Sequence, residues 1–234
     1  MTLDLMFLAR NRLEYTRESL RRIRQNTNWT LVAKFVIYDD GSVDGTLGFL
    51  REQALEMGAE LRQTRFGSGI AAKNDFIERS TADVIATIDN DAMYPPRWLD
   101  LSIVVMQNHP ELQILCLENY QNLKGDLPHS YQRETFGDGL FLARRDCFRG
   151  SLPIPVGTYF GLQAWIRQNE VVVGWIKPSI PVFLLDRVPA EPWRSLAAQY
   201  ETAGWQRPLT GVRPYTDQDA HLWGWCGWSG VLQP

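Results

Sequence analysis

The sequence is poor in cysteine and histidine, with three residues of each type. Cys116, Cys147 and Cys226 are odd in number, far apart in the chain, and lack the CxxC spacing of zinc and redox centres. Neither a disulfide framework nor a zinc site is therefore expected. We expect the three cysteines to be small buried apolar side chains.

Long apolar runs and an excess of one charge are also missing. No segment approaches the roughly 20 uninterrupted apolar residues that cross a bilayer, so no membrane span is expected. The N-terminal apolar run contains Asp4 and follows no basic leader, which is typical of a first strand and not of a signal peptide. The net charge of −3 gives no basic footprint for nucleic acid. These absences predict a cytoplasmic globular protein.

What the first hundred residues do contain is an alternation of short apolar runs with helical patterns. The runs at 3–8, 34–38, 59–63 and 83–88 predict strands, and the second and fourth have the continuous apolar character of buried parallel strands. Residues 46–57 predict a helix, with Thr46 as its N-cap and Gly58 just past its end. Pro96 is predicted to open a further helix. This order is typical of a right-handed α/β sheet, which binds ligands at the carboxyl ends of its strands.

The second half of the chain has a looser pattern. Strands are predicted at 112–117, 137–143, 171–176 and 181–185, and a helix at 158–168. From residue 187 onward no element is predicted. This tail holds five of the nine tryptophans, namely Trp193, Trp205, Trp223, Trp225 and Trp228. Aromatic surface of this size is expected to be covered, either by packing on the core as a lid or by stacking on a sugar acceptor or a nucleobase.

Three polar clusters follow the second, third and fourth predicted strands. They are "YDDGSVDGT" at 38–46, "FGSGIAAKN" at 66–74, and "DND" at 89–91. Each has an ordinary explanation as a turn, a flexible loop or a helix cap. Their convergence on one sheet edge indicates a binding site, because parallel strands bring their carboxyl ends together. Asp89 and Asp91 repel each other unless a cation lies between them, and Mg²⁺ or Mn²⁺ takes such oxygen ligands.

The ordered set of motifs resembles a known family. Asn11-Arg12, "YDDGSVDGT", "GIAAKNDFI", "DND" followed by "YPPRWL", and finally "GLFLARRDCF" are similar to the GT-A fold glycosyltransferases of family 2. The resemblance covers roughly residues 3 to 149. It implies an α/β, Rossmann-like mixed sheet, mostly parallel, with helices on its faces and an irregular Trp-rich C-terminal tail.

The resemblance also implies a nucleotide-diphosphate sugar as donor, most simply a UDP-sugar, and a bound Mn²⁺ or Mg²⁺. Asp39 and Asp40 would then bind the base or ribose, Asp89 the ribose or the metal, and Asp91 the metal. Arg12, Lys73, Asn74 and Asn90 would lie near the donor. A cation at Asp91 would neutralise the charge that grows on the departing nucleoside diphosphate.

One expected feature is missing. Inverting members of the family carry a pair of acids at the start of the helix after the "ARRD" segment, but residues 157–165 here read GTYFGLQAW. Asp138, in the Gly137-Asp138-Gly139 turn, is a candidate base, and a simple turn residue is the alternative. The enzyme can instead retain the anomeric configuration and need no protein base, which is the mode we favour, or the chain can be a non-catalytic nucleotide-sugar binding module.

The C-terminal tail supplies one further candidate ligand. His221 can complete the metal shell, as a C-terminal histidine does in several GT-A enzymes, or it can be a structural residue. We expect residues 1–186 to form the glycosyltransferase domain, with a nucleotide-binding half at 1–117 and an acceptor-side half at 118–186, and residues 187–234 to pack on it as a tail or lid. The acceptor is a glycan, a small molecule, a protein or a modified DNA base, the last as in some phage enzymes.

Overall fold

The computed structural model describes residues 1–117, 130–134, 140–156, 159–177, 182–188 and 191–205. Its centre is a sheet of eight strands in the order β3-β2-β1-β4-β8-β6-β9-β7. Their bounds are β1 Leu3–Ala9, β2 Lys34–Asp39, β3 Glu60–Gln63, β4 Val84–Asp89, β6 Ile114–Cys116, β7 Ser130–Glu134, β8 Phe141–Arg144 and β9 Val173–Lys177. Strands β8 and β7 run against the others, so the predicted mixed, mostly parallel sheet is confirmed.

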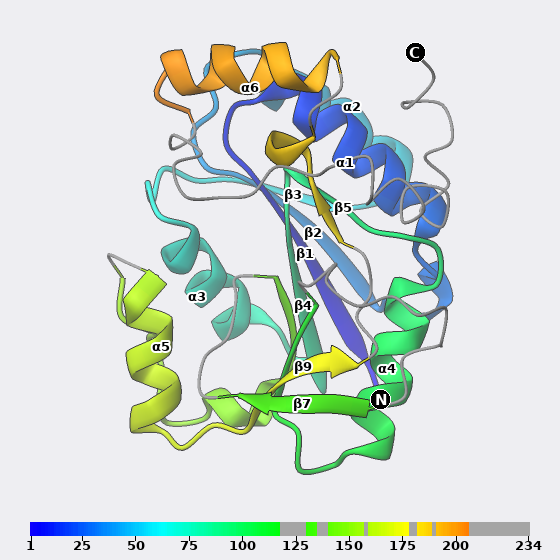
Figure 1. The fold of residues 1–234 in the computed structure, drawn as a ribbon, viewed down its shortest axis with the longest axis vertical. Helices are drawn as coiled ribbons and strands as arrows, with labels where there is room; N and C mark the ends of the chain where they lie inside the picture. Colours follow the sequence, from blue (N-terminus) through cyan, green and yellow to red (C-terminus); the bar gives the residue numbers. More distant parts are fainter. Residues whose placement is uncertain (118–129, 135–139, 157–158, 178–181, 189–190, 206–234) are drawn as a thin grey trace.

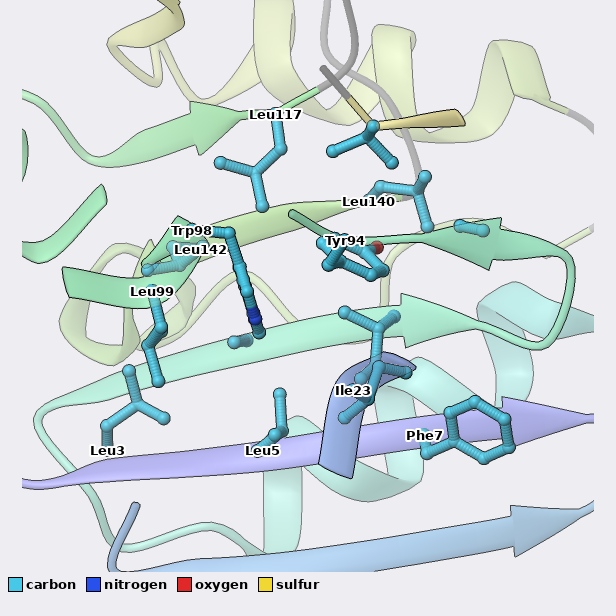
Figure 2. Packing of buried hydrophobic residues seen from close by; sticks show 14 of the residues in the cluster. Leu3, Leu5, Phe7, Ile23, Tyr94, Trp98, Leu99, Leu117, Leu140 and Leu142 are labelled. Carbon is cyan, nitrogen blue, oxygen red and sulfur yellow. The ribbon is translucent and has the colours of Figure 1, made fainter. Parts of the chain in front are cut away.

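Helices cover both faces of this sheet (Figure 1). One face carries α1 (Leu13–Asn26), α2 (Thr46–Met57) and α4 (Trp98–Asn108), and the other carries α3 (Gly69–Arg79) and α5 (Tyr159–Gln168). Side chains along β1 point alternately to the two faces of the sheet, so each face has apolar residues for helices to cover. Leu3, Leu5 and Phe7 pack in the core under α1, α2 and α4, and Met6 packs in the core under α3 and α5. Figure 2 shows the first of these two cores, with Trp98 and Tyr94 among the strand side chains.

Two predicted helix starts are corrected by the structure. The N-cap of α2 is Gly45 and not Thr46, because Asp44 Oδ1 accepts a hydrogen bond from the Thr46 amide and holds it as the first helical residue. Pro96 does not open α4, which begins at Trp98 after Arg97 in a left-handed conformation. The predicted C-terminal glycine is confirmed, since Gly58 has a φ of 63°.

A second, small sheet lies where the sequence predicts only one strand. It pairs β5 (Ala92–Met93) with β10 (Phe183–Leu184) in antiparallel register. The pairing continues into a hydrogen bond from the Leu185 amide to the Asp91 carbonyl, of length 2.7 Å. It therefore fixes the short 3-10 helix η3 (Leu185–Arg187) beside the turn that follows β4.

The tail also contains a helix that the sequence analysis missed, α6 (Trp193–Thr202). It lies above the carboxyl ends of the parallel strands in Figure 1 and packs against η3. Tyr200 of α6 meets Tyr15 of α1 edge to face, with ring centroids 4.9 Å apart, and Trp193 lies 6.0 Å from the same ring. The first part of the tail thus packs on α1, and Trp223, Trp225 and Trp228 lie outside the described residues.

The cysteines in the described part of the chain form no disulfide bond. Cys116 is buried and Cys147 is partly buried, and Cys226 lies outside the described residues. None of the described helices is both long and apolar enough to cross a lipid bilayer.

Candidate functional site

The turn after β4 and the start of α1 form a charged cluster at the carboxyl edge of the sheet. Arg12 donates from one guanidinium nitrogen to Asp91 Oδ2 at 2.8 Å and from the other to Asn90 Oδ1 at 2.9 Å. Asn90 in turn donates to the Asn11 carbonyl and to Thr16 Oγ1. The predicted site residues Arg12, Asn90 and Asp91 are therefore brought into direct contact.

The backbone that presents Arg12 is strained. Asn11 and Arg12 both have positive φ angles, 54° and 63°, in the turn between β1 and α1. Asparagine tolerates this conformation, but for arginine it costs about 1–2 kcal/mol. The turn is held in place because the Asn11 amide donates to Ser42 Oγ and its side-chain oxygen accepts from the Val43 amide. Strain held by surrounding contacts is a frequent property of functional sites.

A second cluster lies after β2 and around the loop between β3 and α3. Asp39 is 2% exposed, and its Oδ1 has no hydrogen-bond partner in the part of the chain that the structure describes. Gly41, with a φ of 79°, turns the chain back over this carboxylate. A cavity of about 360 Å³ opens here. Its lining comprises Arg10, Asp39, Asp40, Gly41, Ser42, Val43, Leu47, Gln63, Thr64, Arg65 and Gly67.

Asp40, the second acid of the pair, is already engaged within the protein. Its Oδ1 accepts from the Phe66 amide at 2.6 Å and from Thr64 Oγ1 at 3.1 Å. These bonds fix the wall of the cavity. The cavity and the Arg12–Asp91 cluster meet through Asn11, which contacts Ser42 and Val43 on one side and Asn90 on the other.

The predicted cluster at 66–74 divides between two places. Lys73, whose side chain is 5% exposed, lies 3.4 Å from Asp89 Oδ1 and so joins α3 to the turn after β4. Asn74 is not brought to the charged cluster, because its amide donates to the Ile154 carbonyl and accepts from the Ile154 amide. Its side chain therefore contacts the segment before α5, and its position near the donor stays a prediction. Asp138 and His221 lie outside the described residues.

Three residues in and around the Arg12–Asp91 cluster were missed by the sequence analysis. Asp186 of η3 has a buried Oδ1 without a hydrogen-bond partner among the described residues, and burial together with the charge of Asp91 raises its pKa to about 6, against the opposing charges of Arg187 and Arg12. Tyr15 is fully buried, its hydroxyl also lacks a partner there, and burial and the charge of Asp186 raise its pKa. Tyr200 accepts a hydrogen bond from the Glu14 amide at 3.3 Å.

The cluster can be tested for its fit to the divalent ion that the motifs imply. Within the described ranges, no group of three side chains from Asp, Glu, His and Cys could enclose a metal. Asp91 is 20% exposed and uses one carboxylate oxygen for Arg12, while its Oδ1 makes no hydrogen bond to the described residues. One or two carboxylates are enough for Mg²⁺ when substrate phosphates supply the remaining oxygens. The residues therefore fit an ion that is shared with a diphosphate.

Comparison with known proteins places the chain in a family. The sequence profile of glycosyl transferase family 2 matches residues 6–167. The chain belongs to glycosyl transferase family 2. The match extends beyond the region that carries the motifs and includes α5, the helix that lacks the acid pair. A search of the curated protein sequences with this family 2 chain found no significant match.

Solved structures with the same fold include the following three proteins. S. aureus TarS 1-349 is 12% identical with a TM-score of 0.63, covering 95% of this chain and 78% of its own. Mannosyltransferase PcManGT from Pyrobaculum calidifontis, in complex with GDP-Man and Mn²⁺, is 15% identical with a TM-score of 0.57. The match covers 74% of this chain and 56% of the PcManGT chain. Glucosyl-3-phosphoglycerate synthase from Mycobacterium tuberculosis, in complex with Mn²⁺ and UDP-glucose, is 17% identical with a TM-score of 0.51. The match covers 74% of this chain and 68% of the synthase chain.

These identities establish a shared fold and no more. The chain spans 36% of the longer TarS chain. The GT-A fold predicted from the motifs is confirmed.

Proposed function

We propose that the chain is a metal-dependent glycosyltransferase that moves a sugar from a nucleotide-diphosphate sugar to an acceptor hydroxyl. The observation that carries this proposal is the joining of two features at one sheet edge. The cavity beside Asp39, whose Oδ1 has no hydrogen-bond partner among the described residues, is connected through Asn11 to the turn that presents Asp89 and Asp91. A nucleoside fits the first feature and a cation-bound diphosphate the second.

The chemistry follows from this placement of the chain's own groups. Asp39 would accept hydrogen bonds from the donor's base or ribose, and Lys73 and Arg12 would balance the carboxylates on either side of the diphosphate. A divalent ion at Asp91 would supply charge neutralisation for the leaving diphosphate. Related folds are known with UDP-GlcNAc, with UDP-glucose and Mn²⁺, and with GDP-mannose and Mn²⁺, so a UDP-sugar is the first donor to test.

A donor hydrolysis assay tests the proposal. The protein is incubated with UDP- and GDP-sugars, with Mn²⁺, Mg²⁺ or EDTA, and the release of nucleoside diphosphate is measured. We expect metal-dependent release with at least one donor, and a loss of about 100-fold or more in Asp91→Asn, since that ligand stabilises the developing charge. Asp146→Asn is the matched control, because it removes an exposed carboxylate that follows β8, near the start of β4 and therefore far along that strand from Asp89.

The stereochemical course is a separate part of the proposal. The sequence has no acid at 157–165, so we propose that the anomeric configuration of the donor is retained. The coupling constant of the product's anomeric proton decides this by NMR. An inverted product would contradict retention and would make Asp138 the first candidate for the base, to be tested as Asp138→Asn.

A further inference from the structure

The segment that follows β10 places a third carboxylate against the charged cluster. Antiparallel pairing of β10 with β5 and the bond from the Leu185 amide to the Asp91 carbonyl fix η3 directly beside the turn after β4. Asp186 is the next residue. It is close enough for its charge to interact with those of Asp91 and Arg12, and also with the ring hydroxyl of Tyr15.

The polar groups in this corner are not satisfied by one another. Asp186 Oδ1 is a buried acceptor without a partner among the described residues, and Arg12 Nε and the Tyr15 hydroxyl are buried donors without one there. A buried polar atom left unpaired costs about 1–3 kcal/mol. The acceptor needs a cation or a donor, and the two donors need an anionic oxygen. A divalent ion bound to a diphosphate supplies both charges.

The balance of formal charge leads to the same conclusion. Asp89 has Lys73 as its cationic neighbour and Asp91 has Arg12, each by an ion pair. Asp186 makes no such pair that the structure describes, and its carboxylate meets the repulsion of Asp91 in a buried position. A charged carboxylate in this environment lowers the stability of the folded protein. Residues that bind a ligand often lower stability in this way.

We propose that Asp186 is the second carboxylate ligand of the divalent ion, opposite Asp91, and that it completes the protein's share of that site together with substrate oxygens. The inference rests on the proposed function, because it assigns a residue to the metal of that same site. It also removes the need for His221 as an essential ligand. Two carboxylates plus a diphosphate match the way Mg²⁺ and Mn²⁺ are usually held at substrate phosphates.

Direct metal binding tests the assignment without reference to turnover. Mn²⁺ is titrated into the full chain with and without UDP, and the free ion is followed by electron paramagnetic resonance. The variants are Asp186→Asn, Asp91→Asn, His221→Ala and, as the matched control, Asp146→Asn. We expect the dissociation constant for Mn²⁺ in the presence of UDP to rise at least about tenfold in Asp186→Asn and in Asp91→Asn, and to stay unchanged in Asp146→Asn and His221→Ala.

Each other outcome has a definite meaning. If Asp91→Asn loses Mn²⁺ while Asp186→Asn binds it as wild type does, the assignment of Asp186 is wrong and the metal-dependent function stands. The assignment also falls if His221→Ala loses Mn²⁺ and Asp186→Asn keeps it. If the wild type binds no Mn²⁺ with or without UDP, the metal dependence of the proposed function fails as well. Thermal unfolding in EDTA verifies folding, and a melting temperature of Asp186→Asn below that of wild type would mean a structural role instead.

Discussion

Arg12 is the residue on which the geometry of the charged cluster depends. Its guanidinium joins Asn90 to Asp91, and its side chain is largely withdrawn from water. Burial alone would lower the pKa of Arg12, but the charge and hydrogen bond of Asp91, with the charges of Asp186 and Asp89, raise it above its ordinary value. The side chain therefore stays charged and orients Asp91 before any ligand arrives.

Removing this guanidinium should destabilise the protein strongly. We expect Arg12→Ala to lower the free energy of unfolding by about 3 kcal/mol, because it leaves Asp91 without its cation and the Asn90 oxygen without its donor. Urea denaturation of the metal-free protein measures this. Arg17→Ala, which removes an exposed arginine from the same helix and its surface pair with Glu14, should cost less than about 1 kcal/mol. Equal losses in the two variants would contradict the role given to Arg12.

A substitution of Asn74 distinguishes a structural role of this side chain from a role in donor binding. Its side chain makes two hydrogen bonds with the Ile154 backbone, so Asn74→Ala should cost about 1–3 kcal/mol through the two polar groups left unpaired. Unfolding experiments should detect this loss in the absence of any ligand. If Asn74→Ala instead keeps full stability and weakens only donor binding, the side chain faces the donor as the sequence suggested.

At the scale of elements, the surroundings of the Asp91 turn depend on α6 and on the small β5–β10 sheet. The helix packs its Tyr200 on Tyr15, and Tyr15 lies beside Arg12 at 5.9 Å from ring centroid to guanidinium carbon. These contacts join a segment from the end of the described chain to the first helix. The tail therefore forms one wall of the charged corner.

Truncation of Tyr200 tests how firmly α6 is attached. We expect Tyr200→Ala to lower the free energy of unfolding by about 3 kcal/mol or more, since it removes a buried ring that packs edge to face on Tyr15. Tyr200→Phe keeps the ring and loses only the bond from the Glu14 amide, at a cost of about 1 kcal/mol. Limited proteolysis should cut α6 faster in the alanine variant. Unchanged cutting in both variants would show that α6 is held by other contacts.

The strands with local signals were predictable, and the elements that depend on remote pairing were not. The apolar runs that became β2 and β4, and the polar residues at their ends, follow from adjacent residues in the sequence. β5 has two residues, too few for any periodic signal, and it exists because β10 pairs with it. Asp186 stands directly after a predicted strand, as Asp89 does, but its proximity to Asp91 depends on that pairing. The N-cap of α2 was missed because Asp44 reaches forward two residues to the Thr46 amide.

At the scale of the whole molecule, the charged corner makes stability depend on pH. The folded pKa of Asp186, about 6, exceeds its unfolded value near 3.8, so the folded state binds more protons between these two pH values. The contribution of this group to stability therefore falls as pH rises from about 4 to above 6. Burial is the largest cause of this raised pKa and the charge of Asp91 on the β4 turn adds to it, while the charges of Arg187 on η3 and Arg12 at the start of α1 oppose it.

Neutralising Asp186 should remove this dependence. In EDTA, we expect Asp186→Asn to be more stable than wild type at pH 8 by on the order of 3 kcal/mol, and nearly equal to it at pH 4. Urea denaturation across this range of pH measures the difference. A constant difference at all pH values would mean that Asp186 does not titrate between folding states.

The antiparallel pairing of β10 with β5 has a consequence for biosynthesis. Chains are made from the N-terminus at about 5–20 residues per second, and N-terminal parts fold first. The residues of β1 to β4 and those that line the cavity beside Asp39 leave the ribosome well before Phe183, while the turn at Asp91 still lacks the strand β10 that lies beside it. Assembly of the corner around Asp91 is therefore a late step in the synthesis of each chain, because it waits for β10.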